Sequence, residues 1–336
     1  MRIATTPKQP GLAYQTPLRA LLSRLTSNDA FFVRDHAHAV PHIAPDEYRL
    51  EVRGATGTQV LRLADLRAMR RTSLVATLAC AGNGRSGFEP VPPGVPWDFG
   101  AISTARWDGV RLSDVLARAG AGTSDAYVVF DGYDPAPDAE RPPYRRSLPL
   151  SRALDDGTIL ADTMNGEPLP PDHGGPVRLL VAGWTANHSV KWLRRIALAE
   201  QPDDGWWMRD YRVAGPGGTL EMIEAAAPMA IIASPQTGAT FARDVVLHGV
   251  AYGEPAPARV LVDVDGVRAG DAEVRYDDGA FAWGRWSFAL TLDSGTHRIA
   301  ARPLDAYGNA GPARATWNAN GYRYDGPHAI EISVSG

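Results

Sequence analysis

Residues 78–86 read Leu78-Ala79-Cys80-Ala81-Gly82-Asn83-Gly84-Arg85-Ser86 and join an apolar strand to a glycine-rich loop. The thiol of Cys80 stands at the junction, where glycines let the backbone approach a large ligand closely. A lone cysteine is most often a small buried hydrophobic residue. Ahead of such a loop and of Arg85, however, a thiolate is more typical of a nucleophile or a metal ligand.

The chemistry of this thiol has three alternatives. A nucleophile needs a histidine base, and His36, His173 and His188 are available, although no local cysteine-protease signature accompanies them. A zinc site needs several cysteine or histidine ligands at short spacing, which the sequence lacks. A single soft thiolate suits a metal whose remaining ligands come from a cofactor, and this is the interpretation that other segments support.

Composition excludes several classes of partner. The chain has 336 residues and a formal net charge of -4. It therefore lacks the overall positive charge that would attract nucleic acid or an anionic membrane. Its apolar runs are too short to span a bilayer, and we expect no membrane insertion. Among its 34 basic residues only Lys8 and Lys191 are lysine, so the lysine at position 191 invites a specific explanation.

The N-terminal 24 residues contain no long apolar core after a basic start and no paired arginines. We therefore expect no export signal and a cytoplasmic location, or a periplasmic one if a signal has been removed. The single cysteine forms no internal disulfide, which is compatible with a reducing compartment.

Residues 1–218 read as a mixed α and β domain. Thr16-Pro17 followed by four leucines up to Leu25 predicts a capped amphipathic helix, and a second helix is expected from Ser113 to Ala119 with Ser113 as the N-cap. Strand-like runs are found at residues 48–52, 74–78, 127–130 and 177–181.

The pattern changes at Gly215-Pro216-Gly217-Gly218, which reads as a domain boundary. Residues 219–336 then form short strands separated by turns. Asp265-Gly266 follows an alternating run of valines and predicts a hairpin, while Trp286, Phe288 and Leu290 share one strand face. This regular spacing suggests a β-sandwich of immunoglobulin-like type.

Several long segments together resemble the sulfite oxidase family of molybdopterin-dependent oxidoreductases. In chain order they are Phe31-Phe32-Val33-Arg34-Asp35-His36, Cys80-Ala81-Gly82-Asn83 with Arg85-Ser86, Trp97, Gly100-Ala101-Ile102-Ser103-Thr104-Ala105-Arg106-Trp107, Met164-Asn165-Gly166-Glu167-Pro168-Leu169-Pro170, Asp172-His173-Gly174, Pro176-Val177-Arg178 and Ser189-Val190-Lys191-Trp192-Leu193. Their shared order over about two hundred residues is far more specific than any one of them. The resemblance implies an α+β chain: a mixed α/β molybdopterin domain, then an immunoglobulin-like dimerisation domain that makes a homodimer.

The resemblance implies a molybdenum-molybdopterin cofactor with Cys80 as the protein ligand to the metal. It assigns four further residues to an anion pocket: Arg34, Arg85, Trp97 and Tyr211. Two guanidiniums suit a pyramidal oxyanion because each offers planar paired donors.

The same resemblance assigns six residues to the pterin and its phosphate. A phosphate prefers concentrated positive charge and backbone donors, which Arg178 and Lys191 would provide. The six are His36, His173, Arg178, Ser189, Val190 and Lys191, with Ser189 and Val190 expected to contribute backbone contacts.

Three positions depart from the family pattern. Gly84 replaces an arginine and removes one positive charge near the pocket, while Asp35 replaces an asparagine and would weaken the anion field if it paired with Arg34. In the second domain, Arg285 stands one residue out of register with a pocket arginine of the family. In a strand, that shift moves a side chain to the opposite face.

The resemblance implies oxidation of sulfite to sulfate by oxygen-atom transfer, with electrons passed to an external acceptor such as a cytochrome. A second hypothesis keeps the cofactor but changes the substrate to nitrate, a sulfoxide or sulfane sulfur, which the changes at Gly84 and Asp35 motivate. A third is a non-enzymatic two-domain protein that binds a partner through its β-sandwich.

Overall fold

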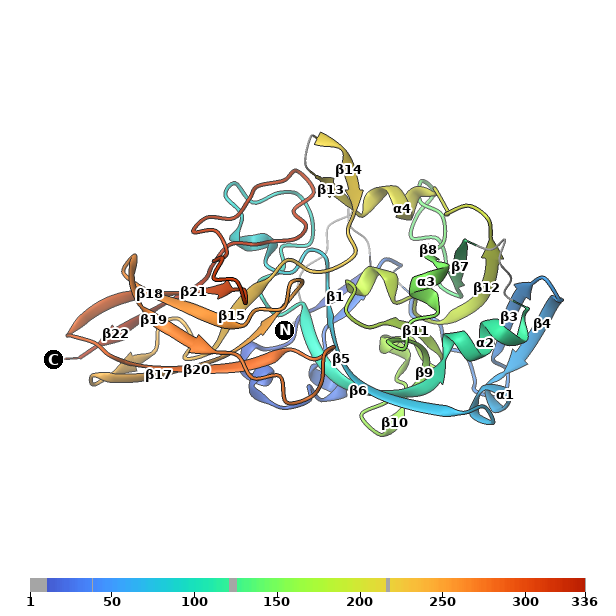
Figure 1. Ribbon diagram of the computed structural model, residues 1–336, viewed down its shortest axis with the longest axis horizontal. Helices are drawn as coiled ribbons and strands as arrows, with labels where there is room; N and C mark the ends of the chain where they lie inside the picture. The colour runs from blue at the N-terminus through green and yellow to red at the C-terminus, as the bar shows by residue number, and fades with distance from the viewer. Residues whose placement is uncertain (1–10, 38, 121–125, 216–217, 336) are drawn as a thin grey trace.

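A computed structural model describes residues 11–37, 39–120, 126–215 and 218–335 of the chain. Two units lie side by side along the long axis of the molecule, and Figure 1 shows the second, in orange and red, at the left. The first unit is built on two five-stranded sheets, and the second on a three-stranded and a five-stranded sheet.

The first sheet of the first domain carries Cys80 at the end of one of its strands. β5 and β6 pair antiparallel over nine residue pairs, and the last four residues of β5 are buried. Because β5 ends at Ala79, Cys80 is the first residue beyond the buried end of this strand, and it is partly exposed. The strands of this sheet are β5 (Arg71–Ala79), β6 (Ile102–Arg111), β9 (Thr158–Met164), β10 (Glu167–Pro168) and β11 (Arg178–Val181).

The second sheet packs its apolar face against the first. Leu50, Phe130 and Ile196 of this sheet belong to the same buried cluster as Leu160 and Leu179 of the first sheet. β12 and β3 run parallel, and the other pairs are antiparallel. The strands, in spatial order, are β4 (Gly57–Arg62), β3 (Arg49–Gly54), β12 (Leu193–Ala199), β7 (Tyr127–Gly132) and β8 (Arg145–Pro149).

Of the two helices that the sequence pattern predicts, one forms as an α-helix. The expected amphipathic helix after Thr16 is wrong: only a 3₁₀ turn forms, because Leu21 is buried while Leu22 stays exposed, so no helical stripe exists. The second expected helix forms as α2 but begins one residue earlier, with Arg111 rather than Ser113 at its N-cap. The α-helices are α1 (Leu63–Arg67), α2 (Leu112–Arg118), α3 (Leu150–Ala153) and α4 (Trp206–Asp210), and the 3₁₀ turns are η1 (Leu18–Leu22), η2 (Asn28–Ala30), η3 (Arg85–Gly87), η4 (Pro171–His173) and η5 (Ala186–His188).

Two short hairpins complete the first domain. β1 (Leu12–Tyr14) pairs with β2 (Val33–Asp35), and β13 (Arg212–Ala214) pairs with β14 (Leu220–Met222). The predicted boundary at residues 215–218 falls in the turn of the second hairpin, and its residues 216–217 lie outside the described residues. Ile223 is fully buried in the core of the first domain, so the packing of that domain continues to this residue.

The second domain is a sandwich of two sheets with one apolar core between them. The predicted hairpin is confirmed, because Asp265 and Gly266 both have positive φ and connect β18 to β19. Trp286, Phe288 and Leu290 share the inner side of β20, as expected from their alternation. The strands are β15 (Met229–Ser234), β16 (Thr240–Phe241), β17 (Asp244–Tyr252), β18 (Arg259–Val264), β19 (Val267–Glu273), β20 (Gly284–Thr291), β21 (Gly295–Leu304) and β22 (His328–Val334).

None of the helices within the described residues is both long enough and apolar enough to cross a lipid bilayer.

The loop after Cys80 belongs to the first domain and packs against the second domain. Figure 1 shows it in cyan, beside the red loop that leads into β22. The indole N–H of Trp317 donates to the Pro90 carbonyl at 2.8 Å, and the Arg323 N–H donates to the Ala81 carbonyl at 2.8 Å. The ring of Tyr324 packs edge-on against Phe88 at 5.1 Å. These contacts seat the C-terminal loop directly against the residues that follow the thiol.

A substitution at Gly84 tests this junction. Gly84 has φ of 80° and an added Cβ would lie 2.9 Å from the ring of Tyr324, so both backbone strain and a clash oppose Gly84→Ala. We expect this variant to lower the free energy of unfolding by about 3 kcal/mol in a denaturant titration. The control is Gly57→Ala, which has φ of 99° but open space around it, and which should cost only about 1 kcal/mol. Equal losses for the two variants would contradict the contact with Tyr324.

Candidate functional site

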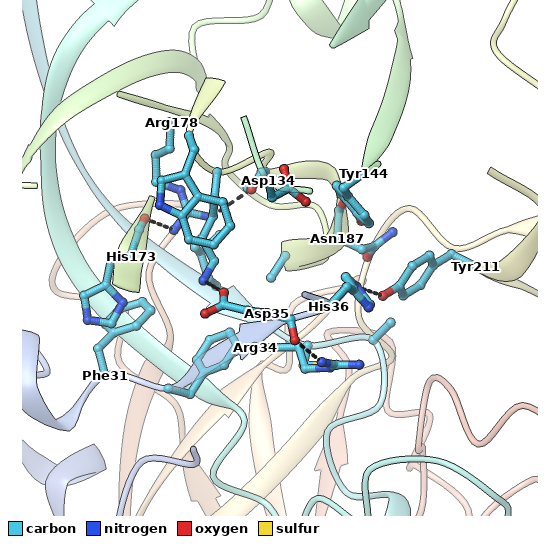
Figure 2. Close-up of a pocket in the computed structure, with 18 residues that line it drawn as sticks. Phe31, Arg34, Asp35, His36, Asp134, Tyr144, His173, Arg178, Asn187 and Tyr211 are labelled. Carbon is cyan, nitrogen blue, oxygen red and sulfur yellow. Dashed lines mark hydrogen bonds and ion pairs between the residues drawn. The ribbon is translucent and has the colours of Figure 1, made fainter. Parts of the chain in front are cut away.

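Two cavities meet at Cys80. Four residues line both of them: Arg34, His36, Cys80 and Tyr211. Figure 2 shows the side chains of the first cavity converging from several elements. This cavity is also lined by Phe31, Phe32, Asp35, Leu78, Ala81, Asp134, Tyr144, His173, Arg178, Ala186, Asn187, Ser189, Lys191 and Trp192. The second cavity is also lined by Arg85, Val95, Trp97, Asp138, Ala139, Glu140, Arg141, Trp206, Trp207, Asp210 and Tyr322.

The turn at Cys80 is held by the backbone of Ala101, the residue before β6. The Cys80 N–H donates to the Ala101 carbonyl at 2.9 Å, and the Asn83 N–H donates to the Cys80 carbonyl at 3.0 Å. The side-chain oxygen of Asn83 in turn accepts the Ala101 N–H at 2.8 Å. Three bonds therefore fix the direction of a thiol that is partly exposed in the cavities.

Arg85 lines the second cavity and also binds the second domain. Its guanidinium is 5% exposed and donates to the carbonyls of Val95 at 3.0 Å, Asn320 at 3.1 Å and Gly321 at 3.1 Å. These partners, within the described residues, use three of the five N–H groups of an arginine. Two N–H groups thus remain for an anion in the cavity, so the predicted anion contact is compatible with this structural role.

Arg34, His36 and Tyr211 approach the thiol from two different elements. The imidazole Nε2 of His36 and the hydroxyl of Tyr211 are hydrogen-bonded at 2.9 Å, as Figure 2 shows. Burial, followed by the charge of Arg34, lowers the pKa of His36 well below its usual range, so this ring is neutral. Burial raises the pKa of Tyr211, which therefore keeps its phenolic proton.

The carboxylate of Asp35 pairs with Lys191 and not with Arg34. The ammonium of Lys191 contacts Asp35 Oδ1 and donates to the Asp172 carbonyl at 2.7 Å. Arg34 donates to the backbone carbonyl of Asp35. The weakening of the Arg34 field that a direct ion pair would cause therefore does not arise. Asp35 Oδ2 is buried and has no hydrogen-bond partner within the described residues.

Arg178 and His173 form the opposite wall of the first cavity. Arg178 is 3% exposed, lies over the ring of Trp107, and donates to the carbonyls of His173 and Ser189, each at 2.9 Å. Burial lowers its pKa to about 10, which still leaves it charged. His173 Nε2 bonds to the Asn28 carbonyl at 2.8 Å, and burial lowers the pKa of this histidine to about 4.

Val190 is the predicted site residue that the structure does not bring to either cavity. Its N–H donates to the His188 carbonyl at 3.2 Å and its carbonyl accepts the Leu179 N–H at 2.8 Å. Both backbone groups of Val190 therefore already have partners within the protein, and the expected backbone contact of Val190 with the cofactor stays a prediction. The other ten predicted residues line one cavity or both.

Arg285 lies outside both cavities. Its guanidinium pairs with Asp277 at 2.7 Å on the surface of the second domain. This position agrees with the one-residue shift in register noted in the sequence.

Three polar residues of the first cavity were missed by the sequence patterns: Asp134, Tyr144 and Asn187. Asp134 follows the end of β7, and burial raises its pKa to about 7. The Tyr144 hydroxyl donates to the Asn187 carbonyl at 2.6 Å, while both polar atoms of the Asn187 side chain are buried without partners in the described residues. A polar residue two positions after a buried strand was the available signal for Asp134, and Asn187 lies two positions before Ser189 of the predicted set.

Comparisons with known proteins agree with this geometry. Residues 37–207 match the family model described as "oxidoreductase molybdopterin binding domain". The chain is 37% identical to the mitochondrial sulfite oxidase of Homo sapiens, over 93% of this chain and 62% of that protein, and 36% identical to the sulfite oxidase of Gallus gallus, over 94% and 76%. The sulfane dehydrogenase SoxCD from Paracoccus pantotrophus superposes with a TM-score of 0.82 and 25% identity, covering 99% of this chain and 88% of that one.

The fold and the site place the chain in the class of proteins that carry an oxidoreductase molybdopterin-binding domain. Within that class, the chain belongs to the sulfite oxidase family. It spans 62% of the length of the human relative.

The residues of the first cavity fit the molybdenum-molybdopterin cofactor of this family. Buried polar atoms without partners are rare in proteins, yet the Asn187 amide and Asp35 Oδ2 are of this kind and border the cavity. A pterin presents ring donors and acceptors that would satisfy them. Arg178 and Lys191 would hold its phosphate, and Cys80 would supply the soft thiolate ligand to the metal.

Asn187 gives a first test of the cavity. Replacing Asn187 with leucine removes two buried polar atoms that lack partners, so we expect the cofactor-free protein to gain about 1 kcal/mol of stability in thermal or denaturant unfolding. The same variant should bind less cofactor, measured as molybdenum per chain after expression in a cofactor-competent host. A fall in stability together with full loading would contradict the assignment.

Asp134 gives a test based on pH. Its folded pKa of about 7 exceeds the usual value of 3.8, so the folded state binds the proton more tightly. This contribution to stability is present at low pH and is lost as the pH rises from about 4 to 7. Asp134→Asn stays neutral, and we expect its cofactor-free form to become more stable than the wild type by on the order of 1–3 kcal/mol at pH 7. A difference between the two proteins that does not change with pH would exclude this titration.

Proposed function

We propose that this protein oxidises sulfite to sulfate. The reaction consumes one water and releases two protons and two electrons for each sulfite. The observation that supports it is the position of Cys80, where the first cavity opens to a second one that carries Arg34 and Arg85. An anion in the second cavity would therefore face the metal ligand.

The protein's part in this reaction is binding and orientation. When bound, the cofactor supplies a molybdenum centre that exchanges an oxygen atom and two electrons. Arg34 and Arg85 would hold the oxyanion by charge-assisted hydrogen bonds. Tyr211, bonded to the neutral His36, would hold a proton beside the anion, and the buried Trp97 would exclude water from that wall.

Sulfane sulfur is the second candidate substrate. It is favoured by Glu140 and Asp210 in the second cavity, whose acidic side chains weaken the attraction of the cavity for a free dianion, while Asp138 pairs with Arg141 there. The similarity to a sulfane dehydrogenase supports the same candidate.

The remaining parts of the proposal concern partners. Electrons would pass to an external acceptor of cytochrome type, and the second domain, proposed to be immunoglobulin-like, would form a homodimer. A non-enzymatic binding protein would need no cofactor, so the molybdenum content of protein from a cofactor-competent host separates that alternative from the enzyme.

The main test is sulfite-dependent reduction of ferricyanide or cytochrome c by molybdenum-loaded protein. We expect turnover, a Mo(V) signal in the EPR spectrum after sulfite addition, and a KM for sulfite at least about tenfold higher in Arg34→Gln, since one charged bond to the anion is lost. The control is Arg285→Gln, which removes a charge outside both cavities and should leave the KM unchanged. Fully loaded protein without sulfite turnover would rule the substrate out, and turnover of a sulfane sulfur compound would then favour the second candidate.

A further inference from the structure

Arg146 is a fully buried arginine beside the active site. It lies on β8 and is 0% exposed, among the largest completely buried side chains of the chain. Its neighbour Arg145 points to the other side of the strand, where it is 42% exposed and lies 3.3 Å from Asp131 and 3.5 Å from Asp203. Of the two adjacent arginines, Arg145 is thus partly exposed beside two carboxylates, and Arg146 is fully buried.

The hydrogen-bond partners of Arg146 are neutral. One terminal nitrogen donates to the Trp207 carbonyl, and the other lies 3.4 Å from His188 Nδ1. Because His188 Nε2 bonds to the Ile223 carbonyl at 2.7 Å, Nε2 carries the ring proton and Nδ1 accepts from Arg146. The guanidinium also lies 5.4 Å from the centre of the Tyr211 ring. Within the described residues, Arg146 makes no ion pair with a carboxylate.

This arrangement is costly for a side chain that serves packing alone. An arginine does not lose its proton in a protein, and an unpaired buried cation loses hydration that neutral acceptors replace only in part. Its Nε has no acceptor within the described residues, which adds to the cost. A balancing negative charge is therefore expected nearby in the working protein.

The field of Arg146 reaches both cavities. Burial raises the pKa values of Asp210 and Tyr144, and the charge of Arg146 opposes both shifts. Burial lowers the pKa of His36, and the charge of Arg146 adds to that shift. These three groups line the cavities at Cys80. Asp210 is the acidic group among them that balances part of the charge of Arg146, but burial raises its pKa and the Tyr322 hydroxyl occupies one of its oxygens at 3.1 Å.

We propose that Arg146 is a positioning residue that favours doubly charged oxyanions in the second cavity. It acts from behind Tyr211, whose ring contacts the guanidinium and whose hydroxyl reaches the cavity. The inference rests on the proposed function and deepens it, because a field effect scales with the charge of the ligand. It therefore separates a dianion such as sulfite or sulfate from a monoanion of similar size.

Three variants of the molybdenum-loaded enzyme test the proposal, with sulfate and nitrate binding measured by calorimetry. Arg146→Gln keeps a hydrogen-bond donor but removes the charge; we expect about tenfold weaker binding of sulfate and about threefold weaker binding of nitrate. Arg146→Lys keeps the charge and should restore most of the sulfate affinity. The matched control, Arg145→Gln, removes the adjacent charge on the opposite face and should leave both affinities unchanged.

Several results would overturn the proposal. They are equal losses for sulfate and nitrate in Arg146→Gln, failure of the lysine to restore binding, or an equal loss in Arg145→Gln. A glutamine variant that does not fold or load molybdenum would assign Arg146 to the architecture or the cofactor instead. Because anion binding is measured without turnover, charge-selective binding in a protein that does not oxidise sulfite would reject the substrate and retain the role of Arg146.

Discussion

Buried positive charge without matching negative charge is the constraint on which the site depends. Arg85, Arg146 and Arg178 are 5%, 0% and 3% exposed, and the acceptors that they bond within the described residues are backbone carbonyls and one histidine nitrogen. Neutral acceptors hold the guanidiniums in place but leave their charges in a medium of low polarity. Bound anions, namely the phosphate of the cofactor and an oxyanion beside Cys80, would complete this balance. Affinity for anions is thereby built into the packing of the domain.

The same constraint explains why the second domain forms part of the site. The carbonyls of Asn320 and Gly321 accept hydrogen bonds from Arg85, and Tyr322 lines the second cavity and stacks on Tyr211 with ring centres 5.3 Å apart. A guanidinium held by carbonyls of two domains keeps its orientation only while both domains are folded and docked. The second domain therefore positions the anion pocket in addition to any role in assembly.

The sequence motifs selected residues that the fold brings together because these residues stand in ordered local segments. Ten of the eleven predicted residues line the cavities, whereas Val190 does not, and its backbone groups pair with His188 and Leu179. Asp134 and Asn187 were missed because their importance comes from burial, which a local pattern does not reveal. The helix expected after Thr16 was wrong for a related reason: packing of a single leucine, Leu21, requires only one turn, and the tertiary contacts override the spacing of the others.

The lysine at position 191 follows from the geometry around Asp35. The chain otherwise uses arginine almost throughout, but this site requires one compact cation that bonds in three directions. The ammonium contacts the Asp35 carboxylate and the Asp172 carbonyl, and within the described residues its third N–H remains for the cavity that it lines. The planar fork of an arginine would direct its paired donors to one side and could not serve these separated acceptors equally. The sequence left open a pairing of the Asp35 carboxylate with Arg34, and the structure pairs this carboxylate with Lys191 instead.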